Sequence, residues 1–364
     1  MNKILIAYFA LIAIVSFAII SCEADSKPKS LRSTSSKLEF SSPKAGSQFV
    51  WGDTIYFKLN LKKEGDVKAE SIALYIDGQL VNEVPGSSMD YSYISSEGSG
   101  GQMKVKGVIN YADGTSSRRR IGIKIVADKE PEKLSYQVIN TFPHDATAYT
   151  QGLQYDLKED VLFEGTGNYT ESRLIKTKVG ENKALLDIPI PDEYFGEGIS
   201  LMNDTVYQLT YKKKKGFYYD REFNKLGEFT YPSEGWGLCN NEEHLIMSDG
   251  SASLYFLDTR SFQIVKSIQV FSDKGPLHNL NELEYVDGVI YANIYTSNFI
   301  AKIDAESGKL LALINMEGIL KKEDVDGRID VLNGIAFNPT YQSFYVTGKW
   351  WPKLFEVRFI EESE

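Results

Sequence analysis

Five short tripeptides, each placed directly before an apolar strand pattern, carry the residues in this sequence best suited to chemistry. They are Gln151-Gly152-Leu153, Glu197-Gly198-Ile199, Trp236-Gly237-Leu238, Asn281-Glu282-Leu283 and Asn333-Gly334-Ile335. Their first positions hold three amides, one carboxylate and one indole. Such a set, if it converges, can orient a polar ligand and move a proton. The alternative is that these side chains only cap backbone groups around a water-filled channel.

The spacing of the tripeptides indicates how they could converge. Their apolar third residues recur 39 to 52 residues apart, and each unit offers further short strand patterns, such as Ser253 to Asp258 and Ile264 to Ile268. Four short strands every ~45 residues is the period of a β-propeller blade. Five units therefore predict five blades over residues 134–359. Because the innermost strand of each blade runs along the central axis, we expect the first tripeptide residues to meet in one funnel.

The fifth unit lacks an outer strand, because the sequence has no further strand pattern after Phe359. A strand pattern without a unit, residues 136–140, precedes the first tripeptide. We expect it to supply the fourth strand of the last blade, since this closes the ring and leaves no sheet edge exposed.

Aromatic residues and one lysine surround the tripeptides at matching offsets. Tyr149 and Phe195 each stand two residues before a first position, while Tyr211 and Tyr295 follow the second strands of their blades. Lys349, followed by Trp350-Trp351-Pro352, has the corresponding place in the last blade. Propellers also use aromatic residues as core, so each ring is explained equally well by packing. An amine beside a carboxylate in an aromatic funnel is the sharper signal.

The same stretches resemble a known enzyme family. They run from Phe142-Pro143-His144-Asp145 through the tripeptides to Val346-Thr347-Gly348-Lys349-Trp350-Trp351-Pro352-Lys353, and cover residues 136–359 in order. This pattern is similar to the plant and bacterial glutaminyl-peptide cyclotransferases. The resemblance implies a five-bladed propeller that converts an N-terminal glutaminyl residue of a peptide or protein to pyroglutamate with release of ammonia. It also implies that no metal and no cofactor is needed.

The resemblance assigns roles residue by residue. Glu197 matches the essential acid of the family, and Phe195 matches an aromatic wall position. Gln151, Trp236, Asn281 and Lys349 match pocket residues. Three departures are visible: Tyr149 replaces the usual Phe, and Tyr211 and Tyr295 stand where Trp is common. The added hydroxyl groups could alter which second residue of the substrate is accepted.

The reaction itself defines what these groups must do. The α-amine of the substrate has a reference pKa near 7.7–8.0, so it must lose a proton before it attacks its own side-chain amide. The departing nitrogen must gain one. Glu197 can accept the first proton and deliver it to the second nitrogen. Lys349, Asn281 and Gln151 could hold the amide oxygen as it becomes negative, and we also expect Asn333 to contact the substrate.

The sequence before the propeller predicts a cellular location and a second domain. Residues 1–21 are typical of a lipoprotein signal peptide, because an apolar run ends at Ile19-Ile20-Ser21-Cys22, and Cys22 is the expected acylation site. Residues 22–37 are polar and predict a flexible tether. Residues 38–128 hold alternating runs punctuated by Asp77-Gly78 and Asp113-Gly114, which predict an immunoglobulin-like β-sandwich. We therefore expect an exported bacterial lipoprotein of the cell envelope, attached to the membrane only through its lipid.

Composition removes several other functions. Lys and Arg number 40 against 50 Asp and Glu, for a net charge of −10, and no basic stripe points to nucleic acid. The three histidines and two cysteines have no metal-ligand spacing.

Two alternative functions stay open. In a metal-dependent propeller lactonase, Gln151, Glu197, Asn281 and Asn333 would offer oxygens to Ca²⁺. In a surface binding module, the propeller would hold a ligand without reaction.

Overall fold

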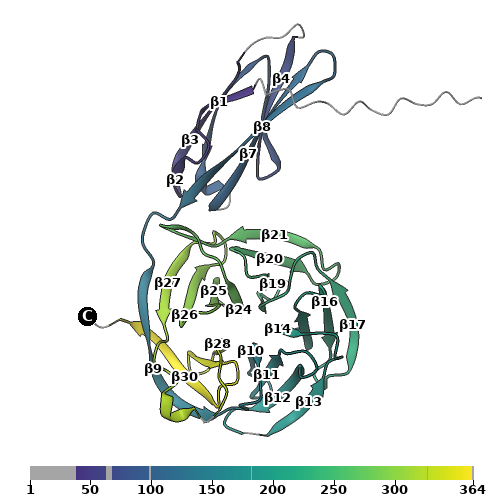
Figure 1. Cartoon of the computed structure of the whole chain (residues 1–364), viewed down its shortest axis with the longest axis vertical. Helices are drawn as coiled ribbons and strands as arrows, with labels where there is room; N and C mark the ends of the chain where they lie inside the picture. The colour runs from purple at the N-terminus through teal and green to yellow at the C-terminus, as the bar shows by residue number, and fades with distance from the viewer. Residues whose placement is uncertain (1–37, 63–67, 98–99, 182, 326, 363–364) are drawn as a thin grey trace, which may run out of the picture. The chain divides into compact units, whose positions relative to one another are not determined.

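The computed structural model describes residues 38–62, 68–97, 100–181, 183–325 and 327–362 (Figure 1). The predicted signal peptide, Cys22 and the tether lie outside this part of the chain. The described residues form β-strands and turns, with two short 3-10 segments at Ser95–Glu97 and Lys322–Asp324. None of the helices in the described ranges is long and apolar enough to cross a membrane.

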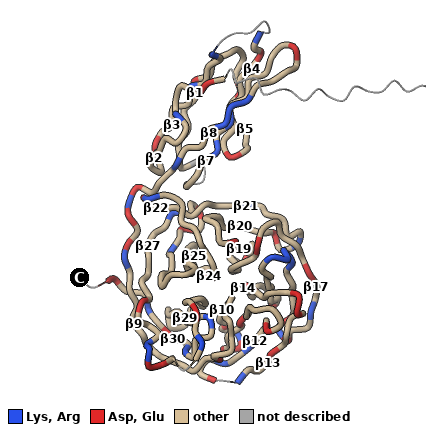
Figure 2. Tube along the Cα trace, viewed as in Figure 1, with Lys and Arg blue, Asp and Glu red and all other residues tan. Residues whose placement is uncertain are grey.

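The first eight strands form the predicted two-sheet sandwich. One sheet has the order β1-β3-β6 and the other β2-β8-β7-β4-β5. The strands are β1 (Leu38–Ser42), β2 (Gln48–Val50), β3 (Thr54–Leu61), β4 (Ala69–Ile76), β5 (Gln79–Pro85), β6 (Ser88–Ile94), β7 (Gly101–Tyr111) and β8 (Ser116–Val126). Strict alternation explains the packing, because Ile55, Phe57 and Leu59 of β3 are buried between exposed neighbours. Arg118, Arg119 and Arg120 are exposed near the start of β8, within the basic stretch that Figure 2 shows on this strand.

Five four-stranded blades follow, as the repeat predicts. The first three have consecutive strands, which are β10 (Thr150–Asp156), β11 (Val161–Thr166), β12 (Arg173–Lys178) and β13 (Ala184–Pro189); β14 (Gly196–Met202), β15 (Thr205–Thr210), β16 (Lys215–Tyr219) and β17 (Lys225–Thr230); and β18 (Leu238–Asn240), β19 (His244–Ser248), β20 (Ser253–Asp258) and β21 (Ile264–Gln269). A small pair, β22 (Phe271–Ser272) and β23 (Gly275–Pro276), leads into the fourth blade. That blade has β24 (Leu280–Val286), β25 (Val289–Ile294), β26 (Phe299–Asp304) and β27 (Leu310–Asn315).

The last blade is completed by the strand that precedes the first, which confirms the predicted closure. Its own strands are β28 (Leu332–Asn338), β29 (Ser343–Gly348) and β30 (Lys353–Glu361), and β9 (Glu132–Pro143) pairs antiparallel with β30 along nearly its whole length. The first residues of β9 also pair in parallel with β27. Figure 1 shows β9 running along the outside of β30 and β27. The fourth and fifth blades thus share one eight-stranded sheet.

Glycine at the centre of the tripeptides lets the inner strands approach one another closely. A Cβ atom on Gly237 would stand 1.9 Å from the carbonyl oxygen of Asn281, and one on Gly198 would stand 2.5 Å from the backbone nitrogen of Leu238. Both neighbours are backbone, which cannot move aside. Glycine is therefore required where one inner strand crosses the next.

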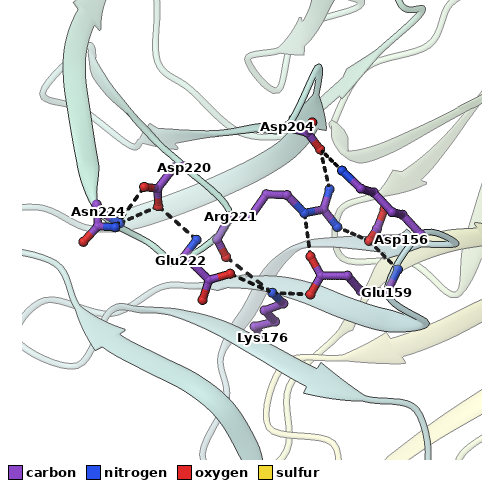
Figure 3. A network of polar contacts seen from close by, with 9 residues as sticks. Asp156, Glu159, Lys176, Asp204, Asp220, Arg221, Glu222 and Asn224 are labelled. Atoms are coloured by element: carbon purple, nitrogen blue, oxygen red, sulfur yellow. Dashed lines mark hydrogen bonds and ion pairs between the residues drawn. The ribbon is translucent and has the colours of Figure 1, made fainter.

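Charged residues clamp the first blade to the second at the ends of their inner strands. Arg221 bonds to Asp156 and Glu159 of the first blade and to Asp204 of the second (Figure 3). Lys176 of β12, which is only 4% exposed, pairs with Glu159 at 2.5 Å. Because Gln151 and Glu197 lie at the opposite ends of β10 and β14, this network supports the ring without contacting the funnel.

We expect the propeller to fold without the sandwich, since β9 closes it from within residues 132–361. A chain beginning at Glu132 should melt close to the temperature of the same region in a chain beginning at Leu38. A chain beginning at Phe142 loses most of β9, exposes β30 and should melt several degrees lower. Calorimetry of the three proteins checks this. Equal melting temperatures for the chains from Glu132 and Phe142 would contradict the closure.

Candidate active site

The starts of the inner strands enclose a cavity of about 180 Å³ on the propeller axis. The residues that line it are Tyr149, Gln151, Phe195, Glu197, Tyr211, Trp236, Asn281, Tyr295 and Lys349. All nine were expected from the sequence. Gln151, Glu197 and Asn281 stand at the second residue of β10, β14 and β24, while Trp236 lies just before β18. The equivalent position in successive blades therefore brings residues far apart in sequence to one small volume.

Asn333 is the one predicted site residue that does not line this cavity, and its contact with the substrate stays a prediction. Its side chain is fully buried, and its Oδ1 atom has no hydrogen-bond partner among the described residues. The Asn333 Nδ2 atom donates to the Thr150 carbonyl at 2.9 Å and to Gln151 Oε1 at 3.2 Å. The side chain is turned along the axis toward β10, where it orients Gln151. Spacing in the sequence places a residue at the right level of the axis, but it does not decide which way its side chain turns.

Glu197 is the buried acid of the cavity. Its side chain bonds to Gln151, and its Oε2 atom has no hydrogen-bond partner among the described residues. Burial raises the pKa of Glu197 well above its ordinary value, against the opposing effects of Lys349 and Gln151, while Glu234 raises it further. Gln151 thus holds the acid through one end of its amide and is held by Asn333 at the other. Its expected contact with the amide oxygen of a substrate stays a prediction.

Lys349 faces the acid across the cavity and is almost as buried, with 3% exposed. Its Nζ atom lies 4.6 Å from the centre of the Tyr149 ring and 5.0 Å from that of Tyr295. Burial lowers the pKa of Lys349, although Glu197 and Asp330 act in the opposite direction. No ion pair joins it to Glu197 or to another described residue, so its three donors remain available to a ligand.

The aromatic side chains form a continuous belt around these charges. Successive ring centres are 6.0 Å apart for Tyr149 and Phe195, 5.9 Å for Phe195 and Tyr211, 6.4 Å for Tyr211 and Trp236, and 5.5 Å for Trp236 and Tyr295. Lys349 contacts both ends and closes the belt. The rings pack against one another and also line the cavity, so packing and ligand contact are compatible roles for them.

Two acids beside the cavity were missed by the sequence reasoning. Glu234 Oε2 accepts a hydrogen bond from Trp236 Nε1 at 3.3 Å, and Asp330 Oδ2 accepts one from the Tyr149 hydroxyl at 3.1 Å. Glu234 stands two residues before a tripeptide, which is the offset of Tyr149 and Phe195 in their blades. That offset could have identified it. Nothing in the spacing pointed to Asp330.

A buried pair formed by His144 and Glu164 lies beside the residues that carry the cavity. His144 Nδ1 lies 2.7 Å from the Trp351 carbonyl and Nε2 lies 3.2 Å from Glu164 Oε2, and both side chains are 8% exposed. Glu164 Oε1 accepts a hydrogen bond from Thr150 at 2.6 Å. Trp351 follows Lys349 by two residues and Thr150 precedes Gln151. The pair therefore ties the segment that carries Lys349 to the start of β10.

Potential sites of other chemistry are few in the described part of the chain. No group of three or more His, Cys, Asp or Glu side chains there is arranged to hold a metal ion. Cys239 is buried and unpaired, and burial raises the pKa of its thiol well above the ordinary value. It therefore packs as a small apolar residue, as expected from the sequence.

Comparison with known proteins agrees with this geometry. The sequence model of a family described as glutamine cyclotransferase matches residues 110–359. The chain belongs to this family. One relative is the glutaminyl-peptide cyclotransferase of Arabidopsis thaliana. It is 36% identical over 233 residues, which cover 62% of this chain and 72% of that protein. The crystal structure of Myxococcus xanthus glutaminyl cyclase is 32% identical, with a TM-score of 0.59, and the match covers 64% of this chain and all of that one.

The His144 pair predicts how stability changes with pH in this family member. Burial opposes a charged imidazole, but Glu164, the Trp351 carbonyl and Asp145 together outweigh it and raise the pKa of His144. The pair should therefore stabilise the fold fully below about pH 6.5, the ordinary value of histidine. This contribution should be lost as the pH rises through the higher value of the folded state.

We expect His144→Gln to lower the free energy of unfolding by about 1–3 kcal/mol at mildly acidic pH and by less at alkaline pH. Urea unfolding of both proteins from about pH 6 to about pH 9 measures this difference. His244→Gln is the matched control, because His244 contacts only the exposed Glu243 among acids. A constant difference across the pH range would show that the imidazole is not charged in the fold.

Proposed function

We propose that this protein cyclises the N-terminal glutaminyl residue of peptides to pyroglutamate and releases ammonia. The observation that carries the proposal is a buried acid, Glu197, facing a buried amine, Lys349, within a closed aromatic belt. Among the described residues, one oxygen of the acid has no partner and the amine has no ion pair. Membership of the glutamine cyclotransferase family and the names of the two relatives support the same reaction. Peptides and proteins that begin with glutamine are the expected substrates.

The unpartnered atoms of the cavity match the groups of such a substrate. Glu197 Oε2 and Asn281 Oδ1 are both acceptors without a partner in the described structure. The α-amine and the side-chain NH₂ of a glutaminyl residue are both donors. Burying an acceptor without a donor costs about 1–3 kcal/mol, so a site that keeps two of them is suited to a ligand rich in N–H groups.

The raised pKa of Glu197 suits proton transfer. Burial raises the pKa of Glu197 well above its ordinary value, which makes its carboxylate a stronger base than an ordinary one. It can therefore take a proton from the substrate ammonium, which frees the nitrogen lone pair. The amine nitrogen attacks the side-chain amide carbon, and Glu197 gives its proton to the departing nitrogen and then takes up the second proton that the ring nitrogen must lose. The bond from carbon to that nitrogen breaks, and ammonia leaves.

Lys349 complements the acid during this step. As the amide carbon becomes tetrahedral, its oxygen gains negative charge, and a buried ammonium group stabilises this charge more strongly than water-exposed donors do. The absence of an ion pair with Glu197 keeps Lys349 free for that oxygen. The aromatic belt excludes water and holds the glutaminyl chain folded, so that amine and amide meet without a large loss of entropy in the transition state.

The donor set weighs against the lactonase alternative. Ca²⁺ takes six to eight oxygen ligands, but Gln151 Oε1 already accepts a hydrogen bond from Asn333. Of the four side chains considered, Glu197, Asn281 and Asn333 each keep an oxygen without a partner in the described structure, which is fewer than Ca²⁺ takes. The cavity also contains Lys349, which would repel a cation.

We further propose that the enzyme is an exported lipoprotein attached to a membrane through acylated Cys22. The support is the sequence alone: an apolar run ending in Ile19-Ile20-Ser21-Cys22, then a polar stretch. The intact mass of membrane-extracted protein should correspond to a chain that begins at acylated Cys22. A mature chain with an unmodified cysteine would refute this.

Glu197→Gln tests the proposed reaction. The variant keeps the size of the side chain but cannot carry a proton, so kcat should fall by about 10²–10⁴-fold with little change in melting temperature. The assay is ammonia release from a dipeptide that begins with glutamine. Glu228→Gln, on the outer strand of the same blade, is the matched control and should retain wild-type turnover.

Three outcomes would contradict the scheme. Near-wild-type kcat in Glu197→Gln would remove this residue from proton transfer. Loss of activity in the wild-type enzyme after treatment with a metal chelator would favour the lactonase-like alternative. If purified wild-type protein binds the dipeptide but releases no ammonia, the chain is a binding module.

A further inference from the structure

A second and larger cavity, of about 470 Å³, adjoins the glutaminyl pocket. One aromatic pair separates the two: Tyr149 lines the pocket, Trp350 lines the second cavity, and their ring centres are 4.4 Å apart. Trp350 is also the residue after Lys349. A peptide whose N-terminal glutamine fills the inner pocket must continue outward, and this cavity lies directly beside it.

The second cavity has the composition of a ligand site. Trp350, Ile329 and Pro352 give it apolar walls, while Arg328, Arg173 and Glu171 bring charge to it. Apolar walls with a few convergent polar groups are typical of binding pockets. Trp350 also has a φ of +59°, a backbone conformation that residues other than glycine rarely adopt. Such strain is held where a side chain must be aimed in a particular direction.

Arg328 is the charged group of this cavity that is available to a ligand. Its guanidinium carbon lies 3.2 Å from the centre of the Trp350 ring, so the planar group is stacked and its orientation is restricted. No described residue forms an ion pair with it. Arg173, in contrast, is neutralised by Asp145 at 2.9 Å and Asp187 at 2.8 Å. Glu171 accepts a hydrogen bond from Asn168 at 3.4 Å.

We propose that this cavity binds the residue that follows the N-terminal glutamine, and that Arg328 makes the enzyme prefer a carboxylate there. The inference rests on the proposed cyclase function and specifies its substrate class: peptides that begin with Gln-Glu or Gln-Asp. A stacked guanidinium presents its N–H groups in a plane, which matches the two oxygens of a carboxylate. Because Arg328 is open to solvent, the preference should be moderate and should decrease as salt is added.

The test compares peptides of the form Gln-X-Phe-amide with X as Glu, Ala or Lys, so that the only carboxylate is on the second residue. For the wild-type enzyme, kcat/KM should be about three- to tenfold higher for Glu than for Ala. Arg328→Gln should remove this preference, so that the values for Glu and Ala become equal. Arg328→Lys should retain part of it. Arg260→Gln, an exposed arginine on the third blade, is the matched control and should behave as wild type.

A second variant separates the two charges of the cavity. If Glu171 rather than Arg328 selects the second residue, the Lys peptide will be preferred and Glu171→Gln will abolish that preference, which would overturn the proposal. The same ratio of Glu to Ala in Arg328→Gln and wild type would also overturn it.

Failure of the proposed function gives a different result. If no peptide is cyclised, calorimetry of the same peptides with wild type and Arg328→Gln still reports whether the second cavity discriminates. If the Glu peptide binds more tightly and this depends on Arg328, the proposed subsite holds although the proposed reaction fails. Equal binding of the peptides would refute the subsite as well as the reaction.

Discussion

The innermost strand of each blade has one edge that no strand of its own blade pairs, and the backbone groups on this edge must find partners across the axis. Glu282 meets this requirement most directly, since its two oxygens accept hydrogen bonds from Leu153 at 3.1 Å and from Ile335 at 2.8 Å. One buried side chain of the fourth blade thereby holds the first and fifth blades together. Burial raises the pKa of Glu282 well above its ordinary value. The positions of Gln151, Glu197 and Asn281 all depend on this axial bonding.

The cavity on the propeller axis contains polar groups that a protein interior selected for stability alone would not keep. Glu197 and Lys349 are buried without pairing to each other, and Asn281 retains an unpartnered oxygen. Such an arrangement costs stability and is retained where a ligand will use it. The fold compensates elsewhere. The cluster around Arg221 joins the first two blades, and β9 adds nine register pairs to the last. The reactive cavity is thus surrounded by parts of the ring that are strongly bonded.

The sequence predicted the architecture well because its repeat reports one physical fact: an inner strand must begin at the same height in each blade. That fact, together with the matching offsets of the flanking aromatic residues and Lys349, led to the nine residues that line the cavity. It could not predict the direction of a side chain, such as that of Asn333, whose amide bonds to the Thr150 carbonyl and to Gln151. Nor could it reveal the contact between His144 and Glu164, since neither residue stands at a tripeptide position or at an offset shared between blades. Glu282 occupies the middle tripeptide position, where the other four tripeptides have glycine. Nothing in the sequence shows that its hydrogen bonds reach two other blades.

The pairing of β9 with β30 has a consequence for how the chain folds during its synthesis. Asn140 and Glu356, which are bonded at 2.7 Å, are separated by 216 residues. The strand that seals the ring is therefore made before any blade, and its partner is made last. Until β30 leaves the ribosome, β9 must remain unpaired along most of its length, and the growing propeller has an open side. Contacts between such distant residues form slowly. A partly made chain is thus most vulnerable to aggregation at the moment when four blades are complete, and a stop or a pause near the C-terminus would be more damaging than one earlier in the gene.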